Sequence, residues 1–201
     1  MPSYQKLMIF VDGTNFLIEL FKEMGLRNFR TDRADKLTLT GIKVASVMIN
    51  CLLHQKIPNS HFLTIIRRYW FSSYKKGNEQ DKIALRNTLR QAGFEPVLFE
   101  KINDKEKGVD IALTKEMLIN AFNQNYDIAL LISGDGDYVD IVNEIKRYGP
   151  IVIGGFFSHG LSDYLRYAFD NFILIDKSIL GGELKWAEPR MIEDEKEIPK
   201  N

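Results

Sequence analysis

The sequence predicts an α/β protein, a three-layer sandwich in which a mostly parallel central sheet carries helices on both faces. Six short apolar runs alternate with longer amphipathic segments, which is typical of parallel strands connected through helices. Most runs are apolar throughout, as expected for strands covered on both faces. The runs are Leu7–Val11, Phe62–Phe71, Pro96–Phe99, Ile128–Ile132, Ile151–Phe157 and Phe172–Ile175.

Helices are expected between these strands, where apolar residues recur at the helical period. Gly93, Gly149 and Pro150 lie just past helix ends, where stop signals belong. The polar segment from Arg27 to Leu39 is expected to form a loop. The candidate helices are Thr14–Met24, Thr40–Gln55, Asn78–Ala92, Val109–Asn123, Asp137–Tyr148 and Leu161–Phe169.

The length of 201 residues, of which 45% are hydrophobic and 27% charged, fits one globular domain. Periodicity ends near Leu180, so we expect a domain over residues 1–180 and a C-terminal tail over 181–201. The apolar runs are far shorter than the ~20 residues of a membrane-spanning helix, and we expect no membrane partner. The run Leu7–Val11 leads directly into Asp12 and is interpreted as a strand, not a signal peptide. The single cysteine, Cys51, excludes an intramolecular disulfide and favours a reducing compartment, so a cytoplasmic location is expected.

The formal net charge is zero, which argues against a basic field over the whole protein, so any site for a polyanion must be local. Between Arg67 and Arg90, seven basic residues stand against two acidic ones, a local excess of five positive charges. Lys75 and Lys76 lie in the expected loop after the second strand, next to Tyr74, whose ring could stack on a base.

Aspartates follow two of the apolar runs. Asp12 comes after the first run, and Asp135 lies in a Gly-Asp-Gly-Asp turn after the fourth. Because the carboxyl ends of parallel strands meet at one edge, we expect the two side chains to lie close together. Crowded carboxylates repel each other unless a cation or a proton compensates, and hard oxygen ligands suit Mg²⁺ or Mn²⁺.

Helical phase selects among the acids of the fifth helix. Asp137 shares a stripe with Ile141 and Ile145 and is expected to face inward, whereas Asp140 shares its stripe with Glu144 and is expected to face water.

Two further polar residues belong to the same hypothesis. Asp110 aligns with Leu113 and Met117 on the apolar side of the fourth helix. Taken singly, each acid could be a helix cap, but four acids at one edge favour a metal site. Asn15 could be an ordinary helix-start residue, or its amide could contact a phosphate or a metal-bound water.

The ordered motifs resemble a known family. They are Ile9–Asn15, Lys107–Asp110, Leu131–Tyr138, and then Ser162, Leu165, Asp170 and Phe172. Together they resemble the NYN domain, a branch of the PIN-like nuclease superfamily. The resemblance implies an acidic pocket of Asp12, Asp110, Asp135 and Asp137, supported by Asn15 and Ser133, in a family whose members are typically RNA endonucleases or RNA-processing factors that use Mg²⁺ or Mn²⁺. Tyr138 departs from the family pattern, because phenylalanine is commoner there.

The resulting prediction is a metal-dependent endoribonuclease in which Lys75, Lys76 and Lys107, with Tyr74, contact RNA. His54, His61 and His159 lie outside the motifs, so none is placed to act as the general base. The main alternative is a catalytically silent RNA-binding or scaffold protein with the same fold. A haloacid-dehalogenase-type phosphatase is excluded, because it needs a nucleophilic aspartate where Phe10 stands. The sequence leaves monomer and homodimer both open.

Overall fold

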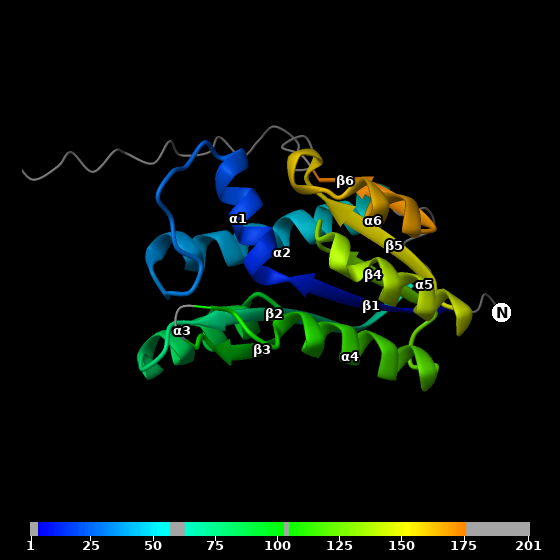
Figure 1. Cartoon of the computed structure of the whole chain (residues 1–201), viewed down its shortest axis with the longest axis horizontal. Helices are drawn as coiled ribbons and strands as arrows, with labels where there is room; N and C mark the ends of the chain where they lie inside the picture. Colours follow the sequence, from blue (N-terminus) through cyan, green and yellow to red (C-terminus); the bar gives the residue numbers. More distant parts are fainter. Residues whose placement is uncertain (1–3, 57–62, 103–104, 176–201) are drawn as a thin grey trace, which may run out of the picture.

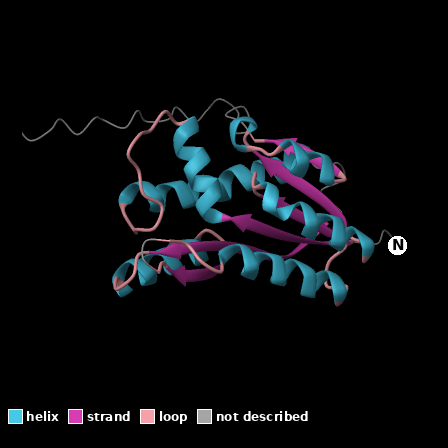
Figure 2. Cartoon of the chain, in the orientation of Figure 1, coloured by secondary structure: helices cyan, strands magenta, loops and turns pink. Residues whose placement is uncertain are grey.

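The computed structural model describes residues 4–56, 63–102 and 105–175 (Figures 1 and 2). Its centre is a six-stranded, all-parallel sheet in the order β3-β2-β1-β4-β5-β6. The strands are β1 (Gln5–Asp12), β2 (Leu63–Tyr74), β3 (Glu95–Glu100), β4 (Ile128–Ile132), β5 (Ile151–Phe156) and β6 (Asn171–Leu174). The expected α/β class with a parallel sheet is confirmed. The tail expected over residues 181–201 lies outside the described residues.

Six α-helices and two short 3-10 turns connect the described strands. They are α1 (Gly13–Glu23), α2 (Lys36–Lys56), α3 (Glu79–Gln91), α4 (Val109–Phe122), η2 (Gly136–Tyr138), α5 (Val139–Arg147), η3 (Ser158–Gly160) and α6 (Asp163–Ala168). Helices α1, α2 and α3 cover one face of the sheet, and α4, α5 and α6 cover the other (Figure 1).

The sequence of β1 explains the three layers. Leu7, Ile9 and Val11 pack toward α1 and α2, while Met8 and Phe10 pack toward α4 and α5. Successive side chains of a strand point to opposite faces, so an unbroken apolar run buries both faces of the central strand. Burying a side chain of this size contributes about 1.5–3 kcal/mol.

The strand order reverses next to β1. From there β2 and β3 extend the sheet in one direction, and β4, β5 and β6 extend it in the other. In open α/β sheets a crevice forms at such a reversal, outside the carboxyl ends of the strands. The carboxyl ends of β1 and β4 carry Asp12 and Ser133, so the fold places the candidate residues at this crevice.

Among the boundaries that differ from the expected ones are those of α2, β2 and α5. Helix α2 begins at Lys36, inside the expected loop, because the Asp35 side chain accepts a hydrogen bond from the Thr38 backbone N–H at 2.8 Å and caps the first turn. Strand β2 continues to Tyr74, and a 3-10 turn precedes α5. By length and composition α2 could cross a membrane, but it packs residues such as Ile42 and Ile49 into the core, as core helices do.

Candidate functional site

Asp12 is the centre of the site. It is the last residue of β1 and the N-cap of α1, and only 4% of its surface is exposed. Its Oδ1 accepts a hydrogen bond from the Asn15 backbone N–H at 3.1 Å. Its Oδ2 lies 3.2 Å from the Tyr138 hydroxyl and 3.4 Å from the Ser133 hydroxyl, both of which can donate. The capping role and the buried site therefore use the same carboxylate.

The following residue has no room for a side chain. A Cβ on Gly13 would lie 2.0 Å from Nε1 of the buried Trp70 ring. Close packing on Trp70 therefore fixes the backbone at the start of α1, directly after Asp12.

Asn15 ties α1 to the loop after β4. Its Oδ1 accepts a hydrogen bond from the Gly134 backbone N–H at 3.1 Å and lies 3.4 Å from the Ser133 hydroxyl. Ser133 Oγ in turn accepts from the Asp135 backbone N–H at 3.2 Å. These contacts join the ends of β1 and β4, and they place Asn15 and Ser133 beside Asp12 as supporting groups.

Tyr138 links two of the expected acids. Its hydroxyl lies 3.2 Å from Asp12 Oδ2 and 3.1 Å from Asp110 Oδ1, although the residue is only 1% exposed. Burial, together with the two carboxylates, raises the pKa of the Tyr138 phenol far above its usual range. The phenol is therefore neutral and has one proton to donate to the two acids.

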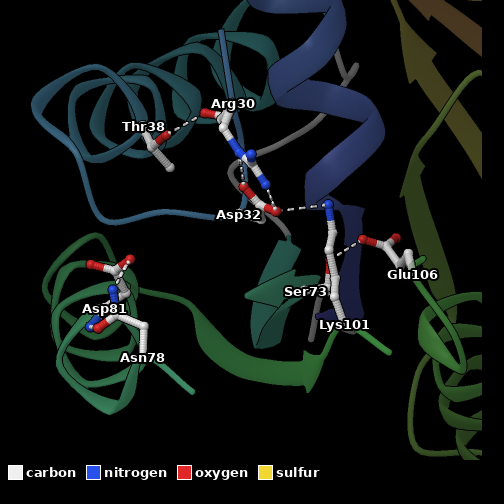
Figure 3. Close-up of polar contacts among 8 residues, drawn as sticks. All are labelled: Arg30, Asp32, Thr38, Ser73, Asn78, Asp81, Lys101 and Glu106. Carbon is white, nitrogen blue, oxygen red and sulfur yellow. Dashed lines mark hydrogen bonds and ion pairs between the residues drawn. The ribbon is translucent and has the colours of Figure 1, made fainter. Parts of the chain in front are cut away.

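Glu106 is an acid of the site that the sequence interpretation missed. Its Oε2 accepts hydrogen bonds from the Thr14 hydroxyl at 2.9 Å and from the Ser73 hydroxyl (Figure 3). It therefore lies between the start of α1 and the end of β2. The one available signal was its place four residues before Asp110, since its partners are distant in sequence.

The electrostatics of the site are unfavourable to negative charge. Burial, followed by the charges of Glu106 and Asp110, raises the pKa of Asp12 from 3.8 to about 7, although hydrogen bonds from Asn15 and Tyr138 oppose the rise. A buried carboxylate beside two other acids needs a proton or a cation to compensate its charge.

Asp135 and Asp137 do not join this cluster. The Asp135 carboxylate caps η2 by accepting from the Asp137 backbone N–H at 3.0 Å, and Asp137 is exposed. The expectation that Asp137 faces inward is wrong, because the 3-10 turn shifts the phase and places Tyr138 in the core instead. Asp140 faces water as expected.

The four aspartates therefore do not converge as expected. Asp110 lies at the boundary between the buried site and the solvent: the residue is exposed, but its carboxylate still reaches the buried Tyr138 hydroxyl. Over residues 4–56, 63–102 and 105–175, no three acidic, histidine or cysteine side chains are close enough together to hold one ion.

The residues expected to contact RNA fall into two groups. The stacking role of Tyr74 is wrong, because β2 extends through this residue and leaves its side chain 5% exposed in the core. Lys76 and Lys107 are exposed and Lys75 is half-buried, so all three reach solvent. His54 is exposed. His159, whose neighbour Gly160 packs against the Gly134 backbone, pairs with Glu19 at 2.9 Å, and His61 lies outside the described residues.

Comparisons with known proteins agree with this architecture. The NYN domain family matches residues 6–176. A crystal structure of a protein of unknown function from Vibrio parahaemolyticus RIMD 2210633 superimposes with a TM-score of 0.63 at 21% sequence identity, covering 88% of this chain and 96% of that chain. At this identity the likeness shows the fold alone. The comparison with curated proteins gave no match.

Proposed function

This chain belongs to the NYN domain family, a PIN-like group whose members are generally nucleases, and from that premise we propose that it is a metal-dependent endoribonuclease. The observation that carries the proposal is the buried Asp12 carboxylate, which lies beside Asp110 and Glu106 with its pKa raised to about 7. A carboxylate in this setting favours a bound cation, which removes the repulsion among the acids.

The donor set fits a hard divalent cation. Asp12 and Asp110 both reach the Tyr138 hydroxyl, so their oxygens lie around one point. Mg²⁺ keeps several of its waters and is usually bound through one or two carboxylates, so two acids are sufficient. We assign Asp12 and Asp110 as the residues that hold Mg²⁺ or Mn²⁺. Asp135 and Asp137, farther out at the same edge, are assigned to contacts through water.

When bound, such an ion lowers the pKa of a coordinated water and stabilises the negative charge that develops on the phosphate. The side chains of the chain supply the positioning. Asn15 and Ser133 hold Asp12 between β1 and β4, and the Tyr138 hydroxyl holds Asp12 and Asp110 together. Lys75, Lys76 and Lys107 provide positive charge for RNA at the same end of the sheet. RNA as the partner and the cytoplasm as the location belong to this same proposal.

A catalytically silent RNA-binding protein is the second candidate. The observation that favours it is that no three potential ligands come together within the described ranges. Both candidate functions include RNA binding, so only an assay of RNA cleavage distinguishes them.

The test is cleavage of labelled single-stranded and hairpin RNA with Mg²⁺, Mn²⁺ or EDTA. We expect cleavage with a divalent ion and none in EDTA. Asp12→Asn and Asp110→Asn should each lower the rate by roughly 100-fold or more, since a metal supplies several kcal/mol of transition-state stabilisation. Asp140→Asn, an exposed acid on α5, is the control and should stay near wild type. Cleavage that persists in EDTA, or none with either metal, contradicts the proposal.

A further inference from the structure

A groove of about 500 Å³ lies at the carboxyl end of β2, at the same edge of the sheet as Asp12. One wall comes from the loop before α2 and the other from the connection between β2 and α3. The lining residues are Arg33, Ala34 and Asp35 on the first wall, and Lys75, Lys76, Gly77, Asn78 and Asp81 on the second.

The charges in the groove favour an anion. Arg33, Lys75 and Lys76 form no ion pair with any other residue in the described part of the chain. The two acids of the lining are each engaged in their own turn. Asp35 accepts from the Thr38 backbone N–H at 2.8 Å, and Asp81 accepts from the Asn78 side-chain amide at 2.7 Å. Three cations against two carboxylates leave a positive groove in a protein whose net charge is zero.

The first wall is held rigidly against the sheet. Asp32, only 2% exposed, accepts two hydrogen bonds from the Arg30 guanidinium, each 2.9 Å, and pairs with Lys101 Nζ at 3.1 Å (Figure 3). Its backbone carbonyl accepts from the Lys75 N–H at 2.9 Å, which joins the two walls directly. The groove therefore exists before any ligand binds, and less ordering is needed on binding.

The groove lies close to the acidic site along the chain. Ser73, two residues before Lys75 on the same strand, donates its hydroxyl to Glu106, which lies beside Asp12. Residues 73–77 therefore connect the acidic site to the groove along the chain.

We propose that this groove binds the phosphate backbone of a single-stranded nucleic acid that runs toward Asp12, with Arg33 and Lys76 as its exposed contacts and Lys75 at its base. The inference rests on the proposed function, because it gives the path of the RNA strand into that site. Backbone phosphates are common to RNA and DNA, so we expect the groove to bind both. A preference for RNA over DNA would come from other parts of the protein.

The experiment measures binding without cleavage. Fluorescence anisotropy follows a labelled oligouridylate, and the matching DNA oligonucleotide, with the Asp12→Asn protein in EDTA across a salt series. Each phosphate neutralised on a single strand contributes about −0.7 to the slope of log affinity against log salt. We expect Arg33→Ala/Lys76→Ala to flatten the slope by about 1.4 for both oligonucleotides. A fourfold rise in salt should then weaken the parent protein roughly seven times more than the variant.

Two matched variants make the result specific. Arg86→Ala/Arg90→Ala removes the same charge from exposed positions of α3 outside the groove lining, and its slope should equal that of the parent protein. The charge-conserving Arg33→Lys/Lys76→Arg should also keep the parent slope. An unchanged slope in Arg33→Ala/Lys76→Ala, or equal flattening in the α3 control, contradicts the proposal that the groove binds the phosphate backbone.

The outcome is independent of the nuclease proposal. If the wild-type protein cleaves no RNA but the groove variant shows the flattened slope, the nuclease proposal fails and the groove stands. If cleavage is metal-dependent but the groove variant keeps the parent slope, only the proposal for the groove is contradicted.

Discussion

At the scale of single residues, Asp12 combines two roles that usually fall to different side chains. As N-cap of α1 it accepts a backbone hydrogen bond, and as the centre of the acidic site it is an ionisable group in a nearly dry position. Capping favours the ionised form, whereas burial and the neighbouring acids favour the protonated one. Burial prevails, and the pKa of Asp12 rises to about 7.

This raised pKa predicts an unusual dependence of stability on pH. Between about pH 4 and pH 7 the metal-free folded protein holds a proton on Asp12 that the unfolded chain has lost. The folded state therefore binds more protons, and the free energy of unfolding falls as pH rises, by up to about 1.4 kcal/mol per pH unit. Urea unfolding in EDTA at several pH values measures this, and Asp12→Asn should flatten the fall within that window. Equal slopes for both proteins would contradict the raised pKa.

The Tyr138 hydroxyl offers a second test at this scale. Tyr138→Phe keeps the buried ring but removes the donor shared by Asp12 and Asp110, so we expect a loss of about 1.5–3 kcal/mol, the range for hydrogen bonds to charged groups. The loss should be larger at pH 8 than at pH 5, where Asp12 is protonated. Tyr126→Phe is the matched control, because that buried hydroxyl donates to the neutral Met117 carbonyl at 2.9 Å and its loss should not vary with pH. Urea unfolding of both variants at the two pH values decides.

The residue scale also shows where the sequence pattern stops being informative. Asp12, Asn15 and Ser133 could be predicted together because each follows or begins an element at one edge of the sheet. Asp137 could not be placed, because one 3-10 turn rotates the following residues and puts Tyr138 in the core. Glu106 had only its place four residues before Asp110 as a signal, since its hydroxyl donors belong to elements far away along the chain.

At the scale of elements, the segment before α2 is more ordered than its polar sequence indicates. It lacks an apolar period, so the pattern predicts a loop as far as Leu39, but side-chain caps and ion pairs determine its structure. Asp35 starts α2, and Asp32 anchors the preceding residues to the sheet through Lys101. Such contacts leave no periodic trace in the sequence. The same segment forms one wall of the basic groove.

Removing the anchor should cost measurable stability. Asp32→Asn removes the negative charge that Arg30 and Lys101 contact. We expect a loss of about 2–3 kcal/mol, below the 3–5 of fully buried pairs, because Arg30 is half-exposed. The Arg30 and Lys101 contacts hold the pKa of Asp32 well below its usual range, so this stabilisation is present above about pH 4 and is lost in strong acid. Glu144→Gln, which breaks a more exposed pair with Arg147 on α5, is the control and should cost under about 1 kcal/mol. Chemical unfolding at neutral pH compares the two, and similar small losses would show that Asp32 is not an anchor.

At the scale of the whole molecule, the six-stranded architecture was predictable because each strand contains a run of apolar residues, and the runs of the central strands β1 and β4 are buried on both faces. Strand Ile128–Ile132 matches its expected bounds, and the other strands begin and end within three residues of theirs. No local pattern predicts the strand order, in which β2 and β3 are added on one side of β1 and β4, β5 and β6 on the other. That order brings β1 and β4 together and creates the crevice in which Asp12 and Ser133 meet.

If this crevice holds a divalent ion, binding there stabilises the folded state as a whole by mass action. At a metal concentration 100 times the Kd the gain is about 2.7 kcal/mol, which corresponds to a rise in Tm of roughly 5–10 °C for a chain of this size. We expect this rise with Mg²⁺ or Mn²⁺, and a smaller one at pH 6 than at pH 8, because protons compete for Asp12. Asp12→Asn/Asp110→Asn should abolish the shift, while Asp140→Asn should retain it. Thermal unfolding with and without millimolar metal makes the comparison. An unshifted wild-type Tm would contradict metal binding at this site, even if RNA still binds the groove.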